Sequence, residues 1–395
     1  MLLPPCEHDP DVLRDLQARL AVQGRLTFAE VMEIALYHPV GGYYTAHVAL
    51  GPEGDFVTAP EEHPAFGALL ARQAAQCWQA LGAPDTLLLV EMGGGRGTLA
   101  AALLAHARDN LPDFFAAVQY LLIDRSPRLI AEQRARLAAF GPRVAWADAV
   151  PAAFTGVLLS NELVDAFPVH RVVMRAGALR ELYVIERAGE FVWEEGDVSS
   201  AAVVDYFARF DITLADGQQA EVNLAAPAWM QAVGRALTRG VVLTIDFGHL
   251  ARELYRPERR NGTLLAYRRQ CVTDELLICL GRQDLIAQVN FSALVDAGNA
   301  AGLTPLGLVT QQNFLLDLGI EGWLAALDDG KLPPRERAGH RRGLLALLNS
   351  AEDGLGNAKV LVQAKGVSAR LDGLMPAARS VNATKLREES LPTER

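Results

Sequence analysis

Five short runs of apolar residues, separated by segments with helical spacing, constrain the fold of this chain more than any other feature. Four runs are strong, at residues 86–90, 118–123, 156–160 and 241–245, and a weaker one covers residues 143–146. Continuous apolar strands that alternate with helices are typical of a parallel sheet covered on both faces. The pattern therefore predicts an α/β fold.

Polar residues follow the strong runs closely, as Glu91, Asp124, Asn161 and Asp246. In open α/β sheets the ligand crevice lies outside the carboxyl ends of the strands. We therefore expect the functional site at this edge of the sheet.

The remaining segments predict the domain organisation. Residues 1–84 are expected to form a helical, loop-rich extension, and residues 85–367 the main domain. Alternating apolar and polar residues predict a small antiparallel meander, inserted at about residues 169–225. Residues 359–364 resemble a last strand, and residues 368–395 a frayed tail.

The strongest motif is Glu91–Thr98, directly after the first run and at the start of a helical segment. Its glycines, Gly93, Gly95 and Gly97, follow the spacing G-x-G-x-G. The dinucleotide-binding pattern G-x-G-x-x-G requires a third glycine at position 98, where the chain has Thr98. The motif fits an E-x-G-x-G-x-G loop, which accommodates the amino-acid end of S-adenosylmethionine. The alternative is a plain glycine-rich turn between strand and helix.

Two further carboxylates are candidates for nucleoside binding. Asp124 ends the second strand, where an acidic residue can accept hydrogen bonds from both ribose hydroxyls. It can equally cap the following helix, and the two interpretations are compatible. Asp148, after the weak strand, can accept from an adenine amino group, or it is a solvated loop carboxylate.

The segment Asn161–His170 follows the apolar run at residues 156–160, where a reacting group should lie beside the glycine loop. Asn161, Glu162 and Asp165 are the candidate catalytic residues, since polar side chains at a strand's carboxyl end often serve catalysis. Glu162 and Asp165 face the same way if the segment turns helically. The alternative is a helix cap followed by a turn.

Composition limits the kinds of partner and site. The 395 residues carry 37 Lys and Arg against 47 Asp and Glu, a net charge of −10. Such a chain is a poor general binder of nucleic acid or anionic membrane. The four cysteines form no C-x-x-C pair, so neither a disulfide framework nor a metal site is expected. The sequence shows no secretory signal and no apolar run of membrane-spanning length, which favours a cytoplasmic location.

Several motifs together resemble one known family, the MidA-like methyltransferases related to mitochondrial complex I assembly factors. The resemblance covers roughly residues 28–365. The motifs that carry it are Ala35–Pro39 with Gly42–Tyr44, Gly54–Glu61, Glu91–Leu99, Asn161–His170, Asp246–His249, Gly262–Leu264 with Tyr267 and Arg268, Gln283 with Asp284, and Thr310 and Gln311 with Phe314 and Leu315.

The resemblance implies a class I, Rossmann-like methyltransferase fold with a seven-stranded, mostly parallel sheet. It implies that S-adenosyl-L-methionine is the cofactor, that the extension covers the cofactor site, and that a protein is the substrate; it leaves a homodimer open. The residues implied to bind the cofactor are Thr58, Pro60, Glu61, Glu91, Gly93, Gly95, Gly97 and Asp124, with Asn161 and Glu162 beside the transferable methyl group.

The chain departs from the family pattern in a few places. Gly94 replaces a usual Pro and Phe247 a usual Tyr, while Ile286, Gln288 and Asn290 stand where Thr, His and Asp are usual. Most of these departures concern the expected acceptor side rather than the cofactor side.

The resulting expectation is direct methyl transfer to a protein, at arginine. A guanidinium group reaches the site charged, so carboxylates must orient it and take up a proton. Glu162 is the first candidate for this role and Asp165 the second. Two alternatives are a non-catalytic assembly factor that binds the cofactor, and an oxidoreductase that uses NAD or FAD.

Overall fold

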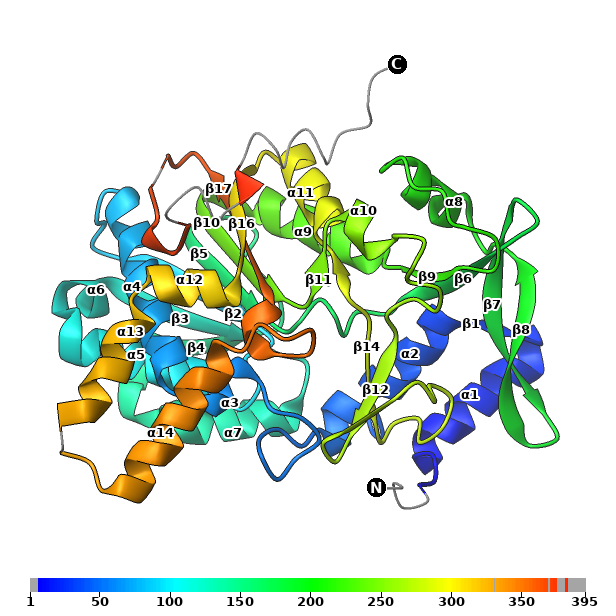
Figure 1. The fold of residues 1–395 in the computed structure, drawn as a ribbon, viewed down its shortest axis with the longest axis horizontal. Coiled ribbons are helices and arrows are strands. Elements are labelled where there is room, and N and C mark those ends of the chain that lie inside the picture. Colours follow the sequence, from blue (N-terminus) through cyan, green and yellow to red (C-terminus); the bar gives the residue numbers. More distant parts are fainter. Residues whose placement is uncertain (1–5, 330, 369, 375–380, 383–395) are drawn as a thin grey trace.

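The computed structural model describes residues 6–329, 331–368 and 370–374, and the backbone of residues 381 and 382. A large α/β part and a smaller β-rich part lie beside each other, and a third, small sheet lies between them (Figure 1). Across these residues, no helix combines the length and the apolar character that crossing a bilayer requires.

The main sheet has seven strands and a two-residue edge piece. Its strands are β2 (Leu87–Met92), β3 (Val118–Ile123), β4 (Val144–Ala147), β5 (Phe154–Asn161), β10 (Leu237–Asp246), β16 (Thr304–Thr310) and β17 (Lys359–Lys365), with β18 (Val381–Asn382) beside β16. The order is β4-β3-β2-β5-β10-β17-β16, and only β17 runs against its neighbours. The predicted seven-stranded, mostly parallel sheet is confirmed.

The sequence patterns indicate six of these seven strands and miss β16. Pro305 and Gly307 interrupt its apolar run, and the pairing with β17 shifts register between them. Proline and glycine inside a strand weaken the strand pattern. Only the pairing with β17 in the structure identifies this segment as a strand.

Helices cover both faces of the main sheet (Figure 1). They are α4 (Ala65–Ala80), α5 (Thr98–Asn110), α6 (Pro112–Ala117), α7 (Pro127–Leu137), α9 (Ala225–Ala236), α11 (Phe291–Ala300), α12 (Gln311–Asp317), α13 (Ile320–Ala326) and α14 (Pro334–Leu347). Successive side chains of β2 point to opposite faces: Leu89 packs in the cluster with α4 and α5, and Val90 in the cluster with α9 and α11. β2 is thus buried on both sides, as its continuous apolar run predicts.

The predicted meander is present as β6 (His170–Arg175), β7 (Ala178–Arg187) and β8 (Glu190–Asp197), followed by α8 (Ala201–Ala208) and β9 (Gln219–Val222). It recruits β1 (Leu26–Thr27) of the N-terminal extension, which pairs with β7. On either side of β1 lie α1 (Pro10–Gln23) and α2 (Phe28–Tyr37), and Thr27 with Glu30 forms a capping box for α2. The extension and the insertion therefore share one sheet.

A third sheet, which the sequence patterns do not indicate, consists of β12 (Leu265–Arg268), β13 (Cys271–Thr273) and β14 (Asp284–Ile286). Nearby, β11 (Gly248–His249) pairs with β15 (Val289–Asn290) just before α11, and α10 (Ala251–Leu254) follows β11. Ala266 and Leu285 of the third sheet pack in one core cluster with α1 and α2. This places the third sheet against the N-terminal extension.

The expected frayed tail from residue 368 is corrected at residues 370–374. Leu371 is 2% exposed in the main core, and the Gly373 N–H donates to Gln73 of α4 at 3.1 Å. Apolar burial and this buried hydrogen bond hold the segment in place. Residues 375–380 and 383–395 lie outside the described residues, and the limits proposed for the extension and the insertion remain predictions.

Candidate active site

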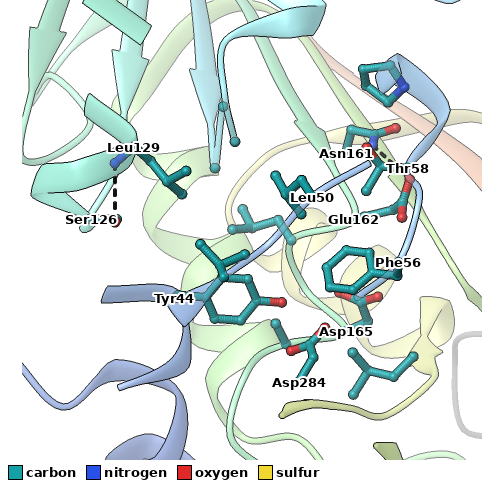
Figure 2. Close-up of a pocket in the computed structure, with 18 of the residues that line it drawn as sticks. Tyr44, Leu50, Phe56, Thr58, Ser126, Leu129, Asn161, Glu162, Asp165 and Asp284 are labelled. Atoms are coloured by element: carbon teal, nitrogen blue, oxygen red, sulfur yellow. Dashed lines mark hydrogen bonds between the residues drawn. The ribbon is translucent and has the colours of Figure 1, made fainter. Parts of the chain in front are cut away.

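A pocket of about 690 Å³ lies at the carboxyl ends of β2, β3 and β5. The N-terminal segment from Tyr37 to Glu61 and the third sheet complete its walls. Figure 2 shows how side chains from these separate elements point into the same space. Small-molecule sites typically enclose ~300–1,000 Å³. No arrangement of three or more His, Cys, Asp or Glu suited to a metal ion occurs within the described residues.

One end of the pocket is the glycine turn between β2 and α5. Gly93, Gly95 and Gly97 have positive φ angles of 73°, 51° and 78°. A Cβ on Gly93 would lie 2.8 Å from Cδ1 of Leu163, whose flexible side chain would have to shift, but the positive φ angle itself disfavours any residue with a side chain there. The sharp turn that the glycines predict is confirmed, and it brings main chain directly to the pocket wall.

Asp124, at the end of β3, lines the same end of the pocket. Its carboxylate accepts hydrogen bonds from the Ser126 N–H at 3.0 Å and from Gln133 Nε2 at 2.9 Å. Burial raises the pKa of Asp124. The cap of α7 is Ser126, whose hydroxyl accepts from the Leu129 N–H. Since a carboxylate has about four acceptor positions, Asp124 retains capacity for a ligand hydroxyl.

Gln133 links the two cofactor-side motifs, although the sequence patterns do not single it out. Its side chain is fully buried in α7, and Nε2 also donates to the Gly95 carbonyl at 2.8 Å. Its Oε1 accepts from Trp146 of β4 at 3.0 Å. Gln133 therefore holds the glycine turn, Asp124 and the sheet edge in a fixed relation.

Glu91, the last acidic residue before the glycines, is 3% exposed yet contributes to the pocket wall. The Tyr120 hydroxyl donates to its Oε2 at 2.8 Å. Burial raises the pKa of Glu91 to about 7, against the opposing effect of the Tyr120 hydrogen bond.

The N-terminal segment forms a cover that is bonded to both ends of the pocket. Thr58, Pro60 and Glu61 line the pocket at α3 (Ala59–Glu62). Thr98 donates from its hydroxyl to Glu61, next to the glycine turn, and the Ala59 N–H donates to Glu162 Oε1 at 3.2 Å. The cover thus contacts the cofactor-side motif and the candidate catalytic residue together.

Glu162 follows β5 in a strained conformation, with φ at +49°. Its N–H donates to the Ile245 carbonyl at 2.8 Å, and its Oε1 also accepts from Asn161 Nδ2 at 3.1 Å. Left-handed backbone at a residue other than glycine costs on the order of 1 kcal/mol and often marks functional positions. Burial, followed by the nearby Asp165, raises the pKa of Glu162 to about 8.

Asp165 and Asp246 form a buried acidic pair below Glu162. Asp246 Oδ2 accepts from the Leu163 and Val164 N–H groups at 3.2 and 2.8 Å, which fixes the turn after Glu162. A hydrogen bond joins Asp246 to Asp165, and burial raises the pKa of both. Asp165 and Glu162 both line the pocket, although the segment does not form the helical turn on which the i, i+3 prediction depends.

The structure brings most sequence-predicted residues together and leaves two outside. Those that line the pocket are Thr58, Pro60, Glu61, Glu91, Gly93, Gly95, Asp124, Asn161, Glu162 and Asp165. Gly97 does not line the pocket; it is the N-cap residue of α5. Asp148 is exposed in the loop after β4, so the structure does not bring it to the pocket. Tyr37, Tyr44, Tyr267 and Asp284 also line the pocket; they belong to motifs that carry the family resemblance, although no role is predicted for them.

The donor set fits S-adenosyl-L-methionine. The left-handed backbone at Gly93 brings main chain to the pocket wall, and Asp124 lies at the end of the neighbouring strand. Backbone at a strand-to-helix turn accommodates the amino-acid portion, and the carboxylate at the next strand end suits ribose hydroxyls. The residues present therefore suit a nucleoside with an amino-acid side arm.

Comparison with protein families agrees with this geometry. Residues 69–309 match the model of a family described as "Putative S-adenosyl-L-methionine-dependent methyltransferase". A COG1565 superfamily member from Burkholderia thailandensis, bound to S-adenosyl-homocysteine, is 33% identical, with a TM-score of 0.81 over 95% of this chain and 98% of that one. Its native form is 32% identical, also with a TM-score of 0.81, over 94% and 97%.

Curated relatives are more distant but similarly long. The human protein arginine methyltransferase NDUFAF7, a mitochondrial protein, is 28% identical over 381 residues, 87% of this chain and 81% of its own length. The Xenopus tropicalis protein of the same name is 29% identical over 342 residues, 78% and 76% of the two chains.

Proposed function

Because this chain belongs to the MidA-like family of S-adenosyl-L-methionine-dependent methyltransferases, we propose that it methylates arginine side chains of a protein substrate. The relatives that are named protein arginine methyltransferases support the choice of acceptor. Membership of a methyltransferase family argues against the oxidoreductase alternative. The glycine spacing, which differs from the dinucleotide-binding pattern, argues against it as well.

The observation that carries the proposal is the concentration of hydrogen-bond acceptors at the end of the pocket formed by the turn after β5 and the third sheet. Glu162, Asp165 and Asp284 line this end. In the part of the chain that the structure describes, no Lys, Arg or His forms an ion pair with them. Two buried amide oxygens, Asn161 Oδ1 and Gln288 Oε1, lack donors among those same residues.

A guanidinium group is complementary to such a surface. It carries a positive charge and five N–H donors in a plane, and it has no acceptor of its own. Each of its donors can meet a carboxylate or amide oxygen that the protein leaves without a cation. The acceptor end is therefore suited to an arginine side chain.

The chemistry requires alignment and removal of a proton. When bound, S-adenosyl-L-methionine supplies an electrophilic methyl carbon, and forming the new N–C bond as the S–C bond breaks leaves one proton to be removed. Glu162 is placed to accept that proton, because its Oε1 is held by the cover and by Asn161 while the side chain borders the pocket. Its raised pKa of about 8 suits a base that works near neutral pH.

Asp165 and Asn161 complete the arrangement. Asp165 supplies a second carboxylate toward the acceptor, and Asp246 fixes the turn that presents it. Asn161 holds Glu162 Oε1 by its amide, which orients the carboxylate. Orientation of reacting groups contributes several kcal/mol to such transfers.

The test uses methyl-labelled S-adenosyl-L-methionine with a cell extract, followed by mass spectrometry of labelled proteins. Label on an arginine nitrogen supports the proposal, and label only on other residue types contradicts it. Glu162→Gln should keep affinity for S-adenosyl-L-homocysteine while transfer falls by about 100-fold or more. If the wild type binds S-adenosyl-L-homocysteine tightly but labels no protein, the non-catalytic assembly factor is the better account.

A further inference from the structure

The small third sheet presents one face to the pocket and the other to a hydrophobic core. Tyr267 and Asp284 are direct partners across β12 and β14. Leu265 and Ile286 form the next pair, and all four line the pocket. Their intervening neighbours are buried in the core cluster with α1 and α2. Alternation along paired strands thus sets an acid and a tyrosine side by side on the pocket face.

Asp284 is held in a defined orientation although it is only 2% exposed. Its Oδ1 accepts from the Leu285 N–H at 3.0 Å, and the Tyr44 hydroxyl hydrogen-bonds to the carboxyl group. Figure 2 shows Tyr44 pointing to Asp284 and Asp165 lying across the same space. Burial first, then Asp165, raises the pKa of Asp284 to about 8. A nearby cation stabilises the charged form of a buried carboxylate in such surroundings.

Aromatic rings enclose the same space. The Phe56 ring, on the cover, meets the Tyr267 ring edge to face, with centroids 6.3 Å apart. The rings of Tyr37 and Tyr44 stack with centroids 5.7 Å apart. Aromatic faces attract cations independently of carboxylates. Arg125 of this chain already lies over the Tyr37 ring, 4.8 Å from its centroid, so it is the Phe56 and Tyr267 rings that favour a ligand cation here.

The third sheet is also tied to the catalytic turn. The Ala287 N–H, directly after β14, donates to the Asp165 carbonyl at 2.9 Å. The position of Asp284 relative to Asp165 is therefore fixed through the main chain as well as by packing.

We propose that Asp284, oriented by Tyr44 and flanked by Tyr267, is the residue that recognises the acceptor cation, opposite Glu162. The inference rests on the proposed function and adds a specificity residue to it. A planar guanidinium can donate to carboxylates on two sides at once, whereas a compact ammonium concentrates its donors at one point. The apolar pair Leu265 and Ile286 offers a wall for the aliphatic stem of an arginine side chain.

The test uses a small guanidinium compound, agmatine, so that no natural substrate is needed. Calorimetry measures its binding to the protein saturated with S-adenosyl-L-homocysteine. Asp284→Asn should weaken agmatine binding by about 30-fold, and Tyr44→Phe by about 4-fold, because charged hydrogen bonds are stronger than neutral ones. Affinity of both variants for S-adenosyl-L-homocysteine should stay within about twofold of wild type.

Tyr43→Phe is the matched control. Tyr43 is the neighbour of Tyr44, and its hydroxyl also donates to a buried carboxylate, Asp55, at 2.8 Å, but it does not line the pocket. Its loss should leave agmatine affinity within about twofold. An equal effect of Tyr43→Phe and Tyr44→Phe would overturn the role of Tyr44.

The outcomes separate this inference from the proposed function. If wild type methylates arginine but Asp284→Asn binds agmatine normally, the recognition role is wrong and the function stands. If wild type binds putrescine, the matched diamine, as tightly as agmatine, the selectivity for guanidinium is wrong. A steady-state readout adds a further check: with an arginine peptide, Asp284→Asn should raise KM more than it lowers kcat.

Discussion

The two ends of the pocket are built in different ways. The cofactor end consists of main chain at a glycine turn and the carboxyl groups of Glu91 and Asp124, all at the ends of adjacent parallel strands. The acceptor end is assembled from side chains of the cover, the turn after β5 and the third sheet, and it is rich in acids. One end depends on backbone shape and the other on convergent charge.

Because the two ends are built differently, we expect donor binding and acceptor recognition to be separable in this protein. Gly93 and Gln133 act at one end, and Tyr44 and Asp284 at the other. The cover contacts both regions, through Glu61 beside the glycine turn and Ala59 beside Glu162. Substitutions at one end should therefore leave binding at the other end nearly unchanged.

The largest expected effect is at the glycine turn. Gly93→Val places a β-branched side chain at φ +73°, a backbone angle that such residues rarely adopt, so the turn is strained. Affinity for S-adenosyl-L-homocysteine should fall by about 100-fold, or ~2.7 kcal/mol, as measured by calorimetry. Gly24→Val is the control, since Gly24 has φ +77° in open space at the end of α1. Equal losses in both variants would point to general destabilisation instead.

Gln133→Leu should give an intermediate effect on the cofactor end alone. It removes the hydrogen bonds to Asp124 and to the Gly95 carbonyl while keeping the volume filled. We expect a loss of about 10-fold in affinity for S-adenosyl-L-homocysteine, with agmatine affinity unchanged. Gln73→Leu, at a fully buried glutamine of α4, is the control. A parallel loss of agmatine affinity in Gln133→Leu would break the separation of the two ends.

The acceptor end should make the stability of the ligand-free protein fall as pH rises from the usual carboxyl pKa to about 8. Burial holds the pKa of Glu162 and of Asp284 at about 8, so the folded state binds more protons than the unfolded state between the usual carboxyl pKa and that value. Stability must then fall as pH rises through this range. From about pH 6 to about pH 8.5 the Tm should drop by at least ~2 °C more in wild type than in Glu162→Gln/Asp284→Asn. Identical drops would show that these acids ionise without cost.

The smallest expected effect is at the rim, where exposed Glu352 and Asp353 border the pocket. Exposed charges mainly change association rates and are screened by salt. Glu352→Gln/Asp353→Asn should lower kcat/KM for a basic peptide by about threefold at low salt and very little at high salt. Asp109→Asn/Asp113→Asn, on exposed positions away from the pocket, provides the control. A loss that persists at high salt would indicate direct contact instead of steering.

The sequence predicts the cofactor end of the pocket better than the acceptor end. The cofactor end comes from contiguous motifs at strand ends, so Gly93 and Asp124 are predicted and lie where expected. Asp148 shows the limit, because a strand-end position does not say whether the following loop turns toward the pocket; here Asp148 is exposed. Gln133 lies within a helix, where nothing in the local pattern marks it.

At the acceptor end the sequence predicts Glu162 and Asp165, but it assigns no role to Tyr44, Tyr267 and Asp284. Tyr44, Tyr267 and Asp284 come from segments that are far apart in the chain, and short strands join them. Strands of two to four residues, such as β1 and β12, carry too little alternation to be predicted. Their pairing depends on long-range contacts, which local propensity does not determine.

The most direct test of the account is whether both ends can be filled together. Agmatine is titrated calorimetrically into the protein, once without and once with saturating S-adenosyl-L-homocysteine. If the two ends are separate sites, we expect one agmatine site in both cases, with dissociation constants within about fivefold of each other. Competition, in which S-adenosyl-L-homocysteine abolishes agmatine binding, would contradict it.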